Sequence, residues 1–238
     1  MIKAALFDVD GTLVDARVWQ GILDHPDVSR WRVRKLYAGM MPRLWWRKLN
    51  PAFDVHFRAH WIQGLAVLLK GWSVEAVDAL AQQVAEAVLT DASRVDVIAF
   101  LKAHKEQGQP VILVSTMFPA ILEHIAGHVG ADAVLGTPFT VRNGVITGQL
   151  AAPPCVGPGK IKAAQTYFAE HAPDIDLSMC AAYADSFSDV PLLAAAGQPC
   201  AVYPDEKLRA VAIARGWRIH PSAAGISFLE YGGPAGPP

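Results

Sequence analysis

The stretch MIKAALFDVDGTLVD, residues 1–15, decides the fold of this 238-residue chain. An apolar run from Ile2 to Phe7 stops at two carboxylates, Asp8 and Asp10, which a Gly-Thr pair follows. A short run of this kind is typical of a buried strand in a parallel sheet, and open α/β sheets place their ligand crevice at the carboxyl ends of such strands. Both acids are therefore predicted to lie at the edge of the sheet where α/β proteins usually have their active site.

Buried carboxylates are costly unless a cation or hydrogen-bond donors compensate their charge. The pair thus indicates a bound metal ion, with one carboxylate free to act as a nucleophile and the other as an acid and base. Asp-x-Asp-Gly also occurs in calcium loops and ordinary turns, so this stretch alone leaves its chemistry open.

The composition, 52% hydrophobic and 18% charged residues, predicts a folded protein with a sizeable core. A net charge of −1 provides no general attraction for nucleic acid, which is not an expected partner. Cys155, Cys180 and Cys200 lie far apart without metal-ligand spacing, which argues against a zinc site and against a disulfide framework. With no signal peptide and no run of about 18 apolar residues, we expect a soluble, cytoplasmic protein without stable membrane insertion.

The pattern becomes helical after Asp15 and stays helical to about residue 107. Within this insertion Ser73 is predicted to cap a helix that continues to Leu89. The end of the chain is rich in glycine and proline and cannot form a packed element. The expected parts are a Rossmann-like catalytic core of residues 1–15 and 108–225, a mainly helical cap of residues 16–107, and a flexible tail of residues 226–238.

From residue 111 onward, apolar runs alternate with helical patterns, which predicts an α/β fold with a doubly wound parallel sheet. The expected strands are VILVS, AVLG, CAAYAD, CAVY and WRIH. One segment, TPFTVRNGVITGQL (residues 137–150), carries Asn143-Gly144 between two β-rich runs, which indicates a tight hairpin. We expect this hairpin to project from the core as a small flap.

The run VILVST, residues 111–116, ends in hydroxyl groups at the same edge of the predicted sheet. The hydroxyl groups of Ser115 and Thr116 are therefore candidate hydrogen-bond donors to a bound phosphate. Hydroxyl groups after a strand are also common helix N-caps, and this alternative stays open.

Gly157-Pro158-Gly159-Lys160 is predicted to open a helix, from which Lys160 can reach the cleft as a fixed positive charge. A lysine at a helix start is otherwise usually solvated. Asp185 and Asp189 follow a small-residue strand and stand four apart across a turn, so both can approach one cation. We expect Asp185 to bind the cation directly, and Asp189 to bind it through water or to pair with Lys160. Magnesium suits such oxygen ligands, although Asp189 is also a candidate helix N-cap.

Together these segments resemble the haloacid dehalogenase superfamily over nearly the whole chain, and its phosphoserine-phosphatase-like branch most closely. The hydroxyl strand, the NG hairpin with ITGQL, the GPGK helix and the stretch ADSFSDVPLLAAAG follow one another in the order of that branch. The resemblance implies a modified Rossmann core with an inserted helical cap, bound Mg²⁺, and a phosphatase that acts on a small phosphorylated metabolite through an aspartyl-phosphate.

Carried over to this chain, the resemblance implies that Asp8 attacks phosphorus. Asp10 would protonate the leaving alcohol and then activate water, while Lys160 neutralises charge. The implied metal set is Asp8, Asp10 through its backbone carbonyl, Asp185 and Asp189, and the implied substrate-binding residues are Gly11, Thr12, Ser115 and Thr116. An acid at Asp10 favours a phosphatase over a dehalogenase, whose leaving group needs no proton.

Two departures from that branch bear on the substrate and on the surroundings of the metal. Phosphoserine phosphatases place a glutamate nine residues after the nucleophile to hold the substrate amine, and this chain has Arg17 there. Ser186 and Ser188 stand where the branch often has glycine and asparagine. Because of Arg17, phosphoserine specificity is not expected, whereas Ser186 and Ser188 alter the surroundings of the metal and leave its ligands in place. A phosphotransferase or phosphomutase, and a non-catalytic phosphate- or membrane-binding protein, remain alternative functions, and the oligomeric state stays open.

The insertion is rich in tryptophan, with six of the seven in the chain, five of them at or before residue 61. These five are Trp19, Trp31, Trp45, Trp46 and Trp61. With the basic residues Arg43, Arg47 and Lys48 nearby, they suit an apolar phosphomonoester or an anionic membrane surface. Tryptophan at helical spacing more often faces a core, so we predict that these side chains pack within the lobe.

Overall fold

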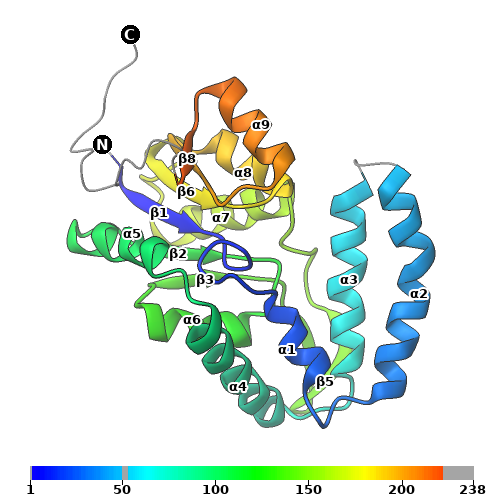
Figure 1. The fold of residues 1–238 in the computed structure, drawn as a ribbon. Coiled ribbons are helices and arrows are strands. Elements are labelled where there is room, and N and C mark those ends of the chain that lie inside the picture. The colour runs from blue at the N-terminus through cyan, green and yellow to red at the C-terminus, as the bar shows by residue number, and fades with distance from the viewer. Residues whose placement is uncertain (1, 50–52, 222–238) are drawn as a thin grey trace.

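A computed structural model describes residues 2–49 and 53–221, without the side chains of residues 47–49 (Figure 1). Its main sheet has six strands in the order β3-β2-β1-β6-β7-β8, and every neighbouring pair is parallel. The strands are β1 (Ala4–Phe7), β2 (Val111–Val114), β3 (Ala133–Leu135), β6 (Cys180–Ala184), β7 (Gln198–Val202) and β8 (Arg218–His220). The predicted doubly wound parallel sheet is confirmed, and the strand order reverses between β1 and β6.

The central strands are buried on both faces, which explains their unbroken apolar sequences. Ala5 and Phe7 join one apolar cluster, whereas Ala4 and Leu6 join the other. The first cluster includes side chains of α5 (Val95–Glu106) and α6 (Pro119–Val129). The second includes side chains of α7 (Pro158–His171), α8 (Val190–Ala195) and α9 (Glu206–Arg215). The sheet is thus the middle layer of three.

The segment predicted to be a helical insertion is helical in the structure. It contains α1 (Val18–Asp24), α2 (Arg30–Leu49), α3 (Asp54–Leu68), α4 (Val74–Ala92) and α5. Figure 1 shows α2 and α3 standing side by side to one side of the sheet. In contrast, α4 packs on α6 and α5 packs on β1 and β2. The last helix of the insertion therefore touches the core sheet directly, and a division between core and cap at residue 107 remains a prediction.

Local signals place several element boundaries. Ser73 caps α4 by accepting a hydrogen bond from the Ala76 amide at 3.2 Å, as predicted. Asn143 and Gly144 have φ values of 50° and 73°, which a tight hairpin of the expected kind requires. This hairpin joins β4 (Phe139–Arg142) to β5 (Val145–Leu150), and β5 packs against α3. Two short 3₁₀ turns, η2 (Leu177–Met179) and η3 (Phe187–Asp189), flank β6.

The tryptophans of the insertion differ in their surroundings. Trp19 and Trp61 pack edge to face, with ring centroids 4.9 Å apart. Trp31, Trp45 and Trp46 are 62%, 64% and 51% exposed, so the prediction that they pack within the lobe is wrong. The reason is that α2 packs on α3 along one side only, which leaves its outer side uncovered by the described residues.

Some predictions fall on residues that are not described. The tail of residues 226–238 and the side chains of Arg47 and Lys48 lie outside the described part of the chain. Within the described part, no helix is long and apolar enough to cross a membrane. Cys155, Cys180 and Cys200 are buried, and their thiols are free.

Candidate active site

The loop after β1 holds the first motif in a fixed conformation. The Asp8 amide donates to the Tyr183 carbonyl at 2.9 Å, which continues the pairing of β1 with β6 past the end of the strand. The chain then turns at Gly11, whose φ is +79°. A Cβ atom at Gly11 would lie 2.2 Å from an Asp185 carboxylate oxygen, so only glycine fits there.

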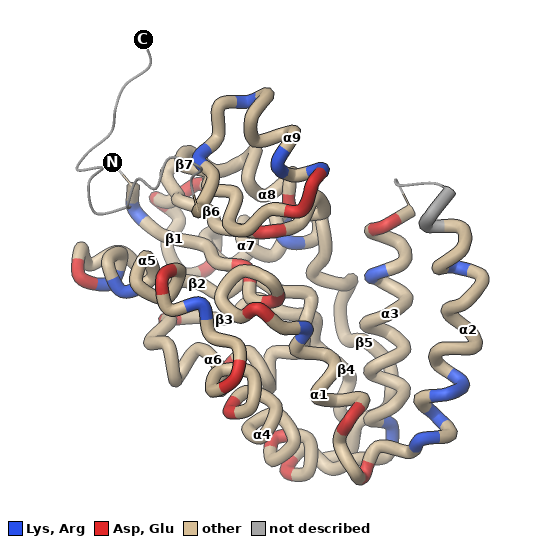
Figure 2. Tube along the Cα trace, in the orientation of Figure 1, with Lys and Arg blue, Asp and Glu red and all other residues tan. Residues whose placement is uncertain are grey.

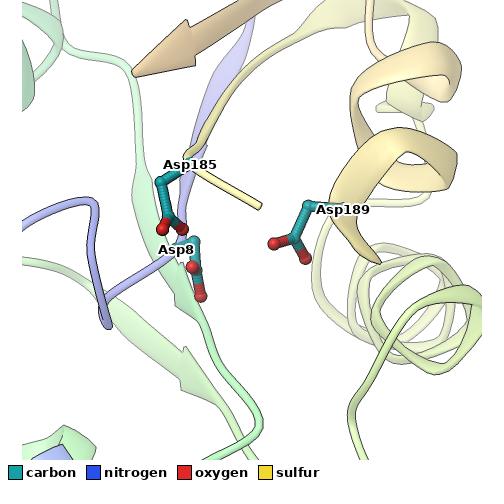
Figure 3. A group of neighbouring side chains, drawn as sticks. All are labelled: Asp8, Asp185 and Asp189. Atoms are coloured by element: carbon teal, nitrogen blue, oxygen red, sulfur yellow. The ribbon is translucent and has the colours of Figure 1, made fainter. Parts of the chain in front are cut away.

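Three carboxylates meet at the carboxyl ends of β1 and β6. Asp8, Asp185 and Asp189 each offer an oxygen within 4.8 Å of the others. Figure 3 shows Asp8 and Asp185 side by side, with Asp189 approaching from the opposite side of the site. Asp8 and Asp189 are only 5% and 2% exposed. The strand reversal thus brings together acids that are far apart in the sequence.

Lys160 lies between two of these acids. Its Nζ atom is 2.7 Å from Asp8 Oδ1 and 2.7 Å from Asp189 Oδ1, and its side chain is buried. Gly157 and Pro158 start α7 two residues earlier, which points the first turn of that helix at the site. The alternative of a solvated lysine is therefore wrong. Asp189 occupies the N-cap position of α8 without a capping hydrogen bond, so its carboxylate serves the site instead of the helix.

The charges at this site do not balance. Burial, together with the charges of Asp8 and Asp189, raises the pKa of Asp185 to about 8 against the opposing effect of Lys160. Burial lowers the pKa of Lys160, but Asp189 and Asp8 raise it above its usual value, so the ammonium group stays charged. One lysine faces three carboxylates, and the excess negative charge with all-oxygen donors fits a divalent cation such as Mg²⁺.

Asp10 lies beside this group without belonging to it. Its Oδ1 accepts a hydrogen bond from the Val18 amide at 2.6 Å, at the first turn of α1, and its Oδ2 accepts one from Ser115 Oγ at 3.4 Å. Burial and the charge of Asp8 raise the pKa of Asp10 to about 6. A carboxyl with this pKa exchanges a proton near neutral pH, as a general acid and base must.

The predicted substrate-binding residues lie in two kinds of place. Gly11, Ser115 and Thr116 line the cavity above the carboxylates. The Ser115 hydroxyl accepts from the Met117 amide at 3.1 Å, and α6 begins later without a side-chain cap, so the N-cap alternative for Ser115 is wrong. Thr12 is buried and donates to Asp185 at 3.4 Å, so its hydroxyl orients a carboxylate.

One cation of the site, Arg58 on α3, was not predicted from the sequence. Its Nη2 donates to Ser186 Oγ at 2.9 Å, and its Nε lies 2.8 Å from Asp54 Oδ2. The contact with Ser186 joins α3 to the turn that carries Asp189. The i,i+4 spacing of Asp54 and Arg58 is the only local signal, and it predicts no more than a helix-surface pair.

A cavity of about 630 Å³ opens above these groups, between the carboxyl edge of the sheet and the layer formed by α1, α2 and α3. Its floor carries the acids, Lys160 and Arg58. Its far wall is apolar and includes Trp19, Met40, Met41, Leu44, Phe57 and Trp61. One pocket thus joins a charged compartment to an apolar one.

The sequence of this chain matches the family model described as haloacid dehalogenase-like hydrolase over residues 5–194. The chain belongs to this family. The match covers the acidic motif at Asp8 and the turn at Asp189, so the residues brought together here come from the haloacid dehalogenase-like part of the chain. The expected family resemblance and fold are confirmed.

Individual relatives agree with this assignment. The chain is 32% identical over 166 residues to a Mycobacterium tuberculosis protein described as a probable phosphatase, an alignment that covers 70% of this chain and 57% of the relative. A Bordetella pertussis protein of unknown function has a similar structure, with a TM-score of 0.78 and 23% identity over 92% of this chain and 98% of that one. A substrate-bound phosphoserine phosphatase superposes with a TM-score of 0.61 and 19% identity over 97% of this chain and 96% of that one.

These likenesses have different weight. The chain spans little more than half the length of the curated relatives it matches. At identities below 25%, the two solved structures show a shared fold alone. Membership of the hydrolase family is therefore shown, whereas the reaction depends on the geometry of the site.

Proposed function

We propose that this chain is a Mg²⁺-dependent phosphatase that hydrolyses a small phosphomonoester through an aspartyl-phosphate on Asp8. The observation that carries the proposal is the buried Lys160 ammonium held between Asp8 and Asp189, with Asp10 close by in a separate, less acidic environment. The relative described as a probable phosphatase supports the same reaction class.

The proposed roles follow from the environments of the two acids. Asp8, held by Lys160, attacks phosphorus and receives the phosphoryl group. Asp10 gives its proton to the leaving alcohol and then takes one from the attacking water, which regenerates Asp8 and releases phosphate. The hydroxyl groups of Ser115 and Thr116 and the amides near Gly11 donate to the phosphoryl oxygens.

The metal residues proposed are Asp8, Asp185 and Asp189 together with the Asp10 backbone carbonyl. A bound Mg²⁺ neutralises charge on the phosphoryl oxygens, which is most of what phosphoryl transfer requires from a protein. Thr12 and Gly11 keep Asp185 in place for this role, the first through a hydrogen bond and the second by leaving room for the carboxylate.

Two alternative functions, phosphotransferase and phosphomutase, would use the same residues. A phosphotransferase or phosphomutase would transfer the phosphoryl group from Asp8 to an alcohol in place of water, and both remain predictions. A protein that only binds phosphate has no use for a nucleophile and an adjacent acid, so Asp8 and Asp10 favour an enzyme.

Buried, free cysteines favour the cytoplasm as its location.

The test is Mg²⁺-dependent phosphate release from a panel of amino-alcohol, sugar, nucleotide and lysolipid phosphates. We expect the wild type to release phosphate from at least one class, and Asp8→Asn to release none. Asp24→Asn, an exposed acid at the end of α1, is the matched control and should behave as wild type. An Asp8→Asn protein with full metal-dependent activity would refute the nucleophile, and a wild type silent on the whole panel would refute the phosphatase.

A second candidate function is association with an anionic membrane surface, and the outer side of α2 favours it. In its 20 residues α2 has seven Lys and Arg and no Asp or Glu. Figure 2 shows basic residues along this helix, without acidic ones. Trp31, Trp45 and Trp46 are exposed among them, and the Lys35 ammonium lies 3.7 Å from the Trp31 ring centroid. Tryptophan with Lys and Arg suits the interface of an anionic bilayer.

Sedimentation with vesicles tests this candidate. We expect binding to vesicles that contain phosphatidylglycerol, weak binding to pure phosphatidylcholine, and loss of binding in Trp31→Ser/Trp45→Ser/Trp46→Ser. High salt should weaken the binding, because the attraction is partly electrostatic. Equal sedimentation of the wild type and the triple variant would refute docking through α2.

A further inference from the structure

We propose that the substrate carries a large apolar leaving group, such as a long alkyl or acyl-bearing alcohol, and that the helical wall of the cavity binds it. This inference rests on the proposed phosphatase function and names its substrate class. The phosphate would sit at the carboxylates, and the hydrocarbon would extend between α1, α2 and α3.

The first observation is the composition of the wall. Trp19 comes from α1, Met40, Met41 and Leu44 come from α2, and Phe57 and Trp61 come from α3. Apart from Arg58, the residues that these three helices contribute to the cavity are apolar or aromatic. Binding pockets are lined by apolar groups that match the apolar part of their ligand.

The second observation is the position of the charges. Every acid that lines the cavity lies in a segment that follows β1, β6 or β7, and among the described residues no Asp or Glu of α1, α2 or α3 lines it. Two cations accompany the wall: Arg58 comes from α3 itself, and the Arg17 guanidinium carbon lies 5.7 Å from the ring centroid of Trp19. At the wall, a leaving group with an ammonium, as in an amino alcohol, would meet positive charge, and the described residues that α1, α2 and α3 contribute to the cavity include no carboxylate partner.

The third observation is that wall residues are open to water. Tyr37, Met41 and Leu44 line the cavity and are still 44%, 60% and 37% exposed. A hydrocarbon chain laid along them would remove apolar surface from water on both partners. A sugar or nucleoside would instead need several polar partners, and the wall offers the Tyr37 hydroxyl and the buried, unpartnered Trp61 Nε1 among the described residues.

The test is a series of linear alkyl phosphates from ethyl to octyl, each used below its micelle concentration. Each methylene buried in the wall should raise kcat/KM by up to about fourfold, until the apolar compartment is full. A profile that is flat or falls with chain length would overturn the inference.

Variants of the wall locate the effect. Met41→Glu/Leu44→Glu puts two charges on exposed positions of the wall, and we expect the ratio of kcat/KM for octyl and ethyl phosphate to fall about tenfold or more. Ile213→Glu changes an apolar side chain of α9 that is 67% exposed and does not line the cavity, and it should leave the ratio unchanged. Equal ratios in both variants would contradict binding along α2.

A binding measurement separates this inference from the phosphatase. Octylphosphonate, which cannot be hydrolysed, should bind more tightly than ethylphosphonate in calorimetry, and Met41→Glu/Leu44→Glu should remove the difference. If no ester is hydrolysed and octylphosphonate still binds preferentially, the phosphatase proposal fails and the apolar site stands. If ethyl phosphate is hydrolysed and neither kinetics nor binding favours the octyl compounds, the inference fails and the phosphatase stands.

Discussion

The carboxyl edge of the sheet and the α2–α3 layer meet in one cavity, but they are built in opposite ways. At the sheet edge, Lys160 contacts two acids at 2.7 Å, and below it Phe7 stacks on Tyr183 with ring centroids 4.3 Å apart. On α2, Trp31 and Met41 are 62% and 60% exposed. Chemistry needs groups held in one geometry by buried partners, whereas recognition needs surface left free for the ligand.

The largest expected effect is on turnover, and it follows from a change of Asp10 at the sheet edge. Asp10→Asn should lower turnover of alkyl phosphates by about 10²- to 10⁴-fold, because the leaving alkoxide loses its proton donor. Nitrophenyl phosphate has a leaving group that needs no proton, so formation of its aspartyl-phosphate should suffer less. Rapid-mixing measurement of nitrophenol release tests this. Equal losses for both substrates in that step would contradict the general-acid role.

The two regions should also differ in what they contribute to stability. Leu113→Ala, in the buried strand β2, should lower the free energy of unfolding by about 2–5 kcal/mol, because it leaves a cavity in the core. Met41→Ala, on the exposed side of α2, should change it by no more than about 0.5 kcal/mol. Urea unfolding of both variants measures the contrast. A similar loss in both would mean that Met41 is part of the core.

A smaller effect is expected at the turn that holds Asp185. Gly11→Ala should weaken Mg²⁺ binding by about 10- to 100-fold, because its Cβ displaces the Asp185 carboxylate, which is one of the proposed metal ligands. Gly108→Ala is the control, since Gly108 also has a positive φ of 71° but no atom within 4 Å of the added Cβ. Calorimetric titration with Mg²⁺ compares the two. Equal affinities would remove Asp185 from the proposed metal set.

The smallest expected effect concerns pH and the core beneath the site. Burial lowers the pKa of His104, whose Nε2 lies 2.8 Å from the Tyr183 hydroxyl, so the folded protein keeps this ring neutral. Below a pH of about 6.5, the ordinary pKa of histidine, the ring binds a proton in the unfolded chain more readily than in the folded protein. The free energy of unfolding therefore decreases as pH falls, by at most about 1.4 kcal/mol per pH unit. Urea unfolding at several pH values between neutral and mildly acidic measures this dependence. In His104→Gln the free energy of unfolding should change less steeply with pH than in the wild type. Identical slopes would contradict a neutral, buried His104.

The contrast between the sheet edge and the α2–α3 layer also explains which features of the structure can be predicted from the sequence. Asp8, Asp185 and Lys160 each follow a strand or open a helix, and parallel strands bring such positions to one edge whatever the details of packing. Ser73 and Asn143-Gly144 are likewise local signals, because a cap or a tight turn involves only neighbouring residues.

The remaining features depend on contacts between distant segments. Arg58 reaches Ser186 across 128 positions, and no local pattern encodes that contact. Helical spacing of tryptophan predicts a helix with an apolar side, but it does not distinguish a side that packs on a neighbour from one that faces a ligand or solvent. Trp61 and Trp31 follow the same pattern, and only the placement of α2 beside α3 separates their surroundings.

Asp8 is proposed to carry the phosphoryl group, and the sharpest test of this role is to trap the intermediate. Enzyme mixed with Mg²⁺ and a hydrolysed ester, quenched in acid within the first turnover and digested, should yield a phosphate adduct on the peptide that contains Asp8. With nitrophenyl phosphate, whose leaving group needs no proton, the Asp10→Asn variant should accumulate more of it, because the water that removes phosphate lacks its base. Phosphate release without an adduct at any quench time, or an adduct on another residue, would show that Asp8 is not the nucleophile.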